Sequence, residues 1–200
     1  MNNAFIDAIR KRRSQYALGS DLPITAEMTT QLIKEAVRQA PSSFNSQSSR
    51  VVILYGAHHQ RFWSFVMEAL RQKVAPDAFA PTEAKINSFA AGAGTVLFYE
   101  DQHTIAALQE QFPSYAENFP VWSEQGSGIA QFAVWTALAN VGIGASLQHY
   151  NPLPDAAAAN EWQLPSHWTL RAQMPFGSHQ GAFKEKEYMD DSERFRVFGI

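Results

Sequence analysis

The sequence predicts an α+β or mixed α/β domain in which helices outnumber strands. Apolar residues recur at helical spacing along much of the chain, and several helices separate successive strand-like runs. Of the 200 residues, 46% are hydrophobic and 18% are charged, so the chain can bury a sizeable core. We expect one domain over residues 1–200, in which residues 187–200 form a C-terminal extension that can dock on its own subunit or on a partner subunit.

Apolar residues spaced three or four positions apart predict the helices. Phe5, Ile6 and Ile9 share one face of the first helix, and Thr25 is a suitable N-cap for the second. The helix over 126–141 is apolar around much of its circumference, which is typical of a central helix or of one in a subunit interface. The predicted helices cover residues 2–13, 25–40, 60–74, 82–91, 103–112 and 126–141.

Short runs rich in β-branched and aromatic residues predict the strands. The run over 94–99 is apolar enough to be buried on both faces. Gly142 and Gly144 end the apolar helix and lead into another such run. The predicted strands cover residues 50–55, 94–99, 145–150 and 168–174, with a short fifth at 194–198.

Charge and cysteine content exclude several classes of protein. A formal net charge of −3 provides no basic field, which argues against nucleic acid as the main partner. The sequence has no cysteine, which rules out disulfides, thiolate metal sites and thiol nucleophiles. We find neither a secretion signal nor an apolar run near the ~20 residues of a membrane span. We therefore expect a cytoplasmic protein that binds neither membrane nor nucleic acid.

A polar junction follows the second predicted helix. Pro41 cannot extend that helix, because its ring clashes with the preceding turn and it lacks an N–H. Ser42, Ser43, Asn45 and Gln47 then present donors and acceptors before the first predicted strand. Such a surface suits a planar ligand with polar edges, such as a flavin. The alternative is a polar turn that serine and asparagine cap.

Two basic groups lie near the ends of the chain. Arg12 and Arg13 close the first predicted helix and are followed by Ser14, a set that suits a phosphate monoester. Lys184 and Lys186 follow a glycine-containing loop near the C-terminus. The alternatives are cations that complement the helix dipole and a solvated strip of charge.

Histidines give weaker indications of chemistry. His149 is a candidate proton donor, although a lone histidine beside a tyrosine in a strand is commonly structural. The adjacent pair His58 and His59 has no third ligand at metal-binding spacing, so we predict no metal site. A hydrolase triad of Ser14, His149 and Asp155 lacks the Gly-x-Ser-x-Gly elbow.

Taken in order, these motifs resemble the FMN-dependent nitroreductase superfamily over nearly the whole chain. Their wording is similar to a short branch, the fatty-acid-repression-mutant-like nitroreductases. The resemblance implies a nitroreductase-like α+β fold, with a central and mostly antiparallel sheet flanked by helices, in an intertwined homodimer. The motifs are Arg-Arg-Ser at 12–14, Pro-Ser-x-x-Asn-x-Gln at 41–47, Gly-Thr-Val-Leu-Phe at 94–98, Gly-Ile-Gly at 142–144, Leu-Gln-His-Tyr-Asn at 147–151 and Lys-x-Lys at 184–186.

The resemblance also implies an FMN site shared between two subunits. One set of residues would hold the phosphate and ribityl chain, a second would line the flavin of the other subunit, and a third would run along the isoalloxazine near N5. The first set is Arg12, Arg13, Ser14, Lys184 and Lys186, the second is Ser42, Ser43, Asn45 and Gln47, and the third is Leu147, Gln148, His149 and Tyr150.

The function implied is that of a homodimeric FMN oxidoreductase. NADH or NADPH would reduce the flavin, and a nitroaromatic, a quinone or a related electron-poor acceptor would then take its place, which gives ping-pong kinetics. No side chain need act as acid or base, because the cofactor carries the redox chemistry. Two alternatives remain: a non-catalytic flavin-binding redox or lipid-response regulator, and a flavin-free protein that binds a phosphoanion.

Overall fold

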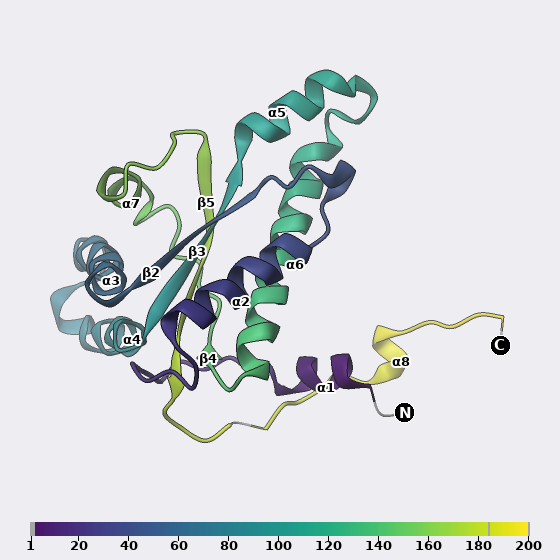
Figure 1. Cartoon of the computed structure of the whole chain (residues 1–200). Helices are drawn as coiled ribbons and strands as arrows, with labels where there is room; N and C mark the ends of the chain where they lie inside the picture. The colour runs from purple at the N-terminus through teal and green to yellow at the C-terminus, as the bar shows by residue number, and fades with distance from the viewer. Residues whose placement is uncertain (1–2, 184, 200) are drawn as a thin grey trace.

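A five-stranded antiparallel sheet forms the middle layer of the protein in the computed structural model, which describes residues 3–183 and 185–199 (Figure 1). The strand order is β1-β5-β3-β2, and β4 pairs with β5 beside this path. The strand β5 therefore contacts three others and is the centre of the sheet. The strands are β1 (Leu18–Gly19), β2 (Ser49–Tyr55), β3 (Gly94–Asp101), β4 (Gly144–Ala145) and β5 (Trp168–His179).

Helices cover both faces of the sheet. The helices α2 (Ala26–Gln39) and α6 (Asn118–Asn140) pack on one face, and α3 (Gly56–Arg71), α4 (Ala80–Ala90) and α7 (Asp155–Glu161) pack on the other (Figure 1). The remaining helices are α1 (Ala4–Lys11), α5 (Gln102–Gln111) and the short α8 (Asp191–Arg194). The predicted α+β class, with an antiparallel sheet between helices, is confirmed.

The strand β3 separates the two cores. Val96 and Phe98 belong to the cluster beneath α2 and α6, whereas Leu97 and Tyr99 belong to the cluster beneath α3 and α4. This alternation follows from the two-residue period of a strand. Every residue of β3 is buried, as the apolar run predicts.

The helix α6 is longer than its sequence pattern predicts. It begins at Asn118 rather than at Gly126. Pro120 does not interrupt it, because this proline lies in the first turn, where a backbone N–H would have no acceptor within the helix in any case. At 23 residues it extends about 35 Å at 1.5 Å per residue. Among the described residues, neither α6 nor another helix combines the length and apolar character needed to cross a membrane.

Two predicted strands are wrong. In the segment 145–150 only Ala145 lies in a strand, and further along Gln148 forms an isolated bridge with Gln173. Backbone hydrogen bonds to β5 continue as far as Gln148, but at Tyr150 the side-chain Oε1 of Gln173 accepts the N–H instead. The segment 194–198 has no neighbouring strand among the described residues. Instead, Asp190 caps α8 by accepting the N–H of Ser192.

The helix α7 is absent from the elements predicted above, although it contains the run of four alanines at 156–159. Alanine has the highest helix propensity, so composition alone favours a helix there. Ala158 is fully buried in the core under α3 and α4, which explains why small side chains occupy this helix.

Candidate functional site

The chain leaves α1 at Arg12 and runs along the sheet into β1. A cavity of about 480 Å³ opens between this segment and the end of β5 with the residues that follow it. The structure thus brings together predicted phosphate-binding residues from both ends of the chain. Those that line the cavity are Arg12, Arg13, Ser14 and Lys186, whereas Lys184 lies outside the described residues.

Trp135 of α6 packs against Arg12, which lines this cavity. The Arg12 guanidinium lies 4.3 Å from the centroid of the Trp135 ring, in cation–π contact. The Trp135 Nε1–H donates to the Ala145 carbonyl over 3.2 Å, which fixes the indole. Burial, and then the charge of Arg13, lower the pKa of Arg12, but an arginine stays charged at any physiological pH.

His179 ends β5 opposite Leu18 and lines the same cavity. Both of its ring nitrogens are buried, and neither has a hydrogen-bond partner among the described residues. Leaving a buried polar group unsatisfied costs about 1–3 kcal/mol. His179 is not among the predicted site residues, because the sequence of a glycine-containing loop does not indicate which groups will surround its histidine.

The segment 147–150 lies close to the basic cavity. Ser14 forms a parallel bridge with Ala145, and the Gln15 N–H donates to the Ala145 carbonyl over 2.8 Å. The chain between Arg12 and β1 therefore runs beside the chain that leads into 147–150. The structure brings these two predicted sets of residues together within one subunit.

Within that segment the four residues differ in their surroundings. Leu147 packs on the core under α2 and α6, and the buried Gln148 exchanges backbone hydrogen bonds with Gln173. Tyr150 contacts the ring of Trp63, 5.9 Å away between centroids. His149 is exposed and has no hydrogen bond or ion pair within the described part of the chain.

The other histidine hypotheses gain no support from the geometry. His58 Nδ1 accepts the indole N–H of Trp162, and His59 is buried against α4. Asp155 accepts from Asn151 rather than from His149. In the described ranges, no group of three or more metal-ligating side chains comes together.

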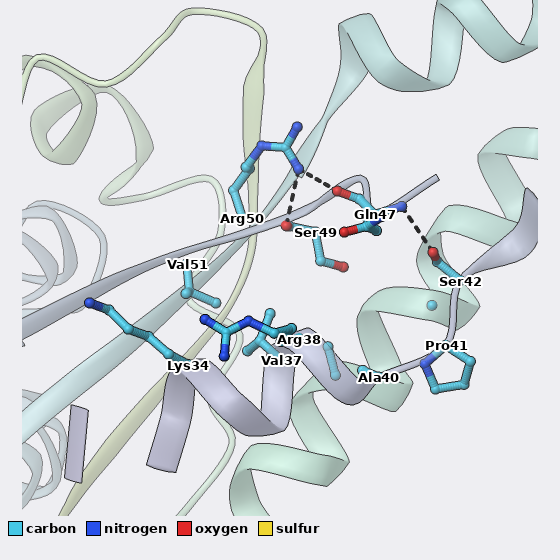
Figure 2. A pocket seen from close by; sticks show the side chains of 12 residues that line it. Lys34, Val37, Arg38, Ala40, Pro41, Ser42, Gln47, Ser49, Arg50 and Val51 are labelled. Atoms are coloured by element: carbon cyan, nitrogen blue, oxygen red, sulfur yellow. Dashed lines mark hydrogen bonds between the residues drawn. The ribbon is translucent and has the colours of Figure 1, made fainter. Parts of the chain in front are cut away.

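The junction over 42–47 contains a short 3₁₀ helix, Ser43–Asn45, and has unusual backbone torsions. Phe44, Asn45 and Gln47 have φ values of 56°, 50° and 48°, a region that costs non-glycine residues free energy. The N–H of Gln47 donates to the Ser42 Oγ over 2.9 Å, which closes the turn (Figure 2). The predicted polar junction is thus a fixed loop.

Aromatic rings hold this loop on the end of α6. The ring of Phe44 lies 4.8 Å from that of Phe112 and 5.3 Å from that of Phe119, and it stacks on Trp122 at 6.2 Å. Each well-placed aromatic pair contributes about 0.5–1.5 kcal/mol beyond its buried area. Phe44 therefore compensates part of the strain at its own backbone.

A buried carboxyl group holds the other side of the junction. Glu100 of β3 is fully buried and accepts hydrogen bonds from the Ser48 Oγ at 2.6 Å and the Ser49 Oγ at 2.5 Å. Burial raises the pKa of Glu100, although both serine hydroxyls oppose this shift. Glu100 thereby fixes the chain where it leaves the loop and enters β2.

Two cavities flank the junction. One, of about 320 Å³, lies between α2 and β2, and Figure 2 shows Lys34 and Arg38 extending toward it from α2. The other, of about 290 Å³, has Trp122 and Ile129 of α6 in its wall. Ser42 lines both cavities.

The junction and the basic cavity lie at different positions along the axis of α6. Ser42 lies against Gly126, where an added Cβ would come within 3.9 Å of the serine Cβ. Arg12 lies on Trp135, nine residues further along α6, or about 14 Å at 1.5 Å per residue. Within one subunit, Ser42, Ser43 and Gln47 line the two cavities at the junction, and Asn45 is not among the residues that line them. The basic cavity is separate and is lined by Arg12, Arg13, Ser14 and Lys186.

Comparisons with known proteins identify the class to which this fold and site belong. The sequence matches the Nitroreductase family over residues 9–178. HBN1 of Saccharomyces cerevisiae is 34% identical over 194 residues, or 96% of each chain. Nitroreductase FRM2 of the same yeast is 31% identical over 189 residues, or 94% of each chain.

Solved structures agree with this assignment. Nitroreductase CinD from Lactococcus lactis, in complex with chloramphenicol, is 49% identical and covers 97% of this chain and 99% of its own, with a TM-score of 0.89. A nitroreductase with bound FMN from Desulfitobacterium hafniense shares the fold at a TM-score of 0.72 and 15% identity, over 100% of each chain. The chain belongs to the nitroreductase family, and it is an oxidoreductase.

Proposed function

We propose that this protein is a homodimeric FMN-dependent oxidoreductase. It takes electrons from NADH or NADPH and reduces nitroaromatics, quinones or related electron-poor acceptors by a ping-pong mechanism. CinD has been solved in complex with chloramphenicol and with 4-nitrophenol, and both compounds carry a nitroaryl group. The observation that carries the proposal is the cavity in which Arg12, Arg13, Ser14 and Lys186 meet.

The donor set of this cavity fits the phosphate end of FMN. Guanidinium, ammonium and hydroxyl groups are the partners of a phosphate monoester, and the described lining contains no carboxylate to repel it. Bound FMN supplies two-electron redox chemistry through its ring. Arg12, Arg13, Ser14, Lys184 and Lys186 would bind its phosphate and ribityl chain.

The ring would lie where two subunits meet. Within one chain the loop 42–47 lies about 14 Å along α6 from the basic cavity, as its placement at Gly126 shows. We infer that Ser42, Ser43, Asn45 and Gln47 line the flavin of the other subunit. Leu147, Gln148, His149 and Tyr150 would line the flavin of their own subunit, because their segment adjoins Ser14.

The protein's own residues would position the cofactor and would not transfer protons. The loop 42–47 is already fixed by the Ser42 hydrogen bond and by Phe44, so little ordering is left to occur on binding. Trp135 holds the Arg12 guanidinium in place for the phosphate. His149 lacks the orienting hydrogen bond that a general acid needs, and we assign it no proton transfer.

The C-terminal extension would complete the dimer. Its described part, residues 187–199, is exposed throughout and leaves the body of the subunit (Figure 1). It nevertheless carries large apolar side chains, which favour burial against another surface. We propose that this extension docks on the partner subunit through Tyr188, Met189, Phe195, Val197 and Phe198.

The test of this function uses the purified full-length protein. The preparation should absorb between roughly 350 and 500 nm, where an oxidised flavin shows. NADH or NADPH under anaerobic conditions should bleach that absorbance, and a nitroaromatic or a quinone should restore it. A protein that stays colourless and takes up no added FMN overturns the proposal. A yellow protein that neither nicotinamide bleaches is a flavin-binding module without this activity.

A second test addresses the shared site. Asn45→Ala should weaken FMN binding to the dimer, whereas Asn160→Ala, an exposed change on α7, should not. Equal FMN affinity in both variants would exclude the loop 42–47 from the cofactor site.

A further inference from the structure

His179 lies where the basic cavity meets a second and smaller cavity of about 60 Å³. Pairing with Leu18 fixes its backbone, and the N–H of Gln180 donates to the Ala17 carbonyl over 3.1 Å. The ring of Phe183 lies 4.5 Å from the imidazole and covers it. The ring is thus held by strand pairing and packing, and not by hydrogen bonds of its own.

Two buried nitrogens that have no partner among the described residues require an explanation, because nearly all buried polar groups in proteins have partners. The imidazole shares its cavity with Arg12, Arg13, Ser14 and Lys186. A phosphate oxygen bound to those residues would provide the acceptor that an imidazole N–H lacks. No carboxylate lines either cavity, so the described lining offers no competing anion.

We propose that His179 is a direct ligand of the cofactor's phosphate group. The inference rests on the proposed FMN site and adds a residue to it. A neutral imidazole offers one N–H to the phosphate, whereas an imidazolium offers two and a positive charge. The other charged or titratable groups that line the two cavities are Lys11 at the end of α1, Arg12 and Arg13 after it, Tyr16 in the following segment, and Lys186.

The test compares FMN with riboflavin, which lacks the phosphate. His179→Leu should weaken FMN binding on the order of tenfold, the loss of one charge-assisted hydrogen bond, and leave riboflavin binding unchanged. His179→Asn, which keeps an N–H donor, should recover part of the FMN affinity. The matched control is His58→Leu, an exposed histidine on α3 outside both cavities, which should bind FMN as the unmodified protein does.

The comparison of the two flavins separates a phosphate ligand from a packing residue. Loss of packing would weaken the binding of FMN and riboflavin alike, whereas loss of a phosphate ligand weakens the binding of FMN alone. Equal losses of FMN and riboflavin affinity would overturn the proposal.

Inorganic phosphate provides a readout that does not depend on the flavin. It should raise the melting temperature of the unmodified protein more than that of His179→Leu, which would also show that the variant folds. Equal shifts in the two proteins contradict the inference. If the unmodified protein bound phosphate but no FMN, the proposed function would fail while the role of His179 as a phosphate ligand would stand.

Discussion

Acidification should destabilise the protein through His59. The Trp63 indole N–H donates to the Thr95 hydroxyl over 2.9 Å, and His59 Nδ1 lies 2.8 Å from the same oxygen. The other ring nitrogen lies 3.2 Å from the Ala90 carbonyl, which can only accept. These contacts are satisfied together when Nε2 carries the proton and Nδ1 accepts from Thr95. A second proton, on Nδ1, would remove the acceptor of the Thr95 hydroxyl. It would also place a positive charge on a ring that is only 1% exposed.

The magnitude follows from the shift in protonation. Burial is the largest cause that lowers the pKa of His59 from 6.5 to about 4. The unfolded chain therefore takes up a proton at a higher pH than the folded chain does. Stability falls as the pH drops from 6.5 toward 4 and does not fall further through this group below that. The full loss is about 3 kcal/mol at 1.36 kcal/mol for each pKa unit.

Urea unfolding at several pH values between about 4 and 8 measures this loss. His59→Gln removes the titrating ring, and its free energy of unfolding should depend less steeply on pH than that of the unmodified protein. His58→Gln, on the exposed side of α3, should keep the original pH dependence. If His59→Gln and the unmodified protein show parallel pH profiles, the reasoning from this buried network is wrong.

Three further changes test other parts of the structure. Phe44→Ala should lower the free energy of unfolding by about 1–2 kcal/mol through lost aromatic contacts and also weaken FMN binding, whereas Phe44→Tyr should do neither. The raised pKa of Glu100 means that the unmodified protein loses stability as the pH rises above 4.5, so Glu100→Gln should become more stable relative to it in that direction. A difference in the free energy of urea unfolding between the two proteins that does not change with pH contradicts this. Gly177→Ala should cost about 1–3 kcal/mol or more in thermal unfolding, since an added Cβ would lie 2.1 Å from the Gly19 carbonyl oxygen, and an unchanged melting temperature would show that β1 moves freely.

The elements that could be predicted from the sequence are those whose signal is local. The apolar run of β3 and the spacing of Ile33 within α2 specify burial without knowledge of their neighbours. The segment 145–150 does not form the predicted strand, because its regular pairing ends at Ala145 and the N–H of Tyr150 binds the side chain of Gln173 rather than a backbone group. That substitution depends on contacts between residues far apart in the sequence.

The candidate site divides in the same way. Arg12, Arg13 and Ser14 could be selected because a basic run followed by a hydroxyl has its own chemical meaning. His179 could not be selected from the sequence. Its ring nitrogens have no partners among the described residues, and the position of the ring depends on pairing with Leu18. A buried group without a partner can be recognised only from the three-dimensional positions of the residues around it.

The length of α6 has a consequence for how this chain can vary. Ser42 rests on Gly126 and Arg12 on Trp135, so one continuous helix sets the spacing between the two binding regions. A single residue inserted between these positions would turn the second contact by about 100° and shift it by about 1.5 Å. Surface loops can absorb insertions, but the middle of α6 cannot. In chimeras and length variants of this protein, junctions, insertions and deletions should therefore lie in the loops. The number of residues between 126 and 135 should stay unchanged.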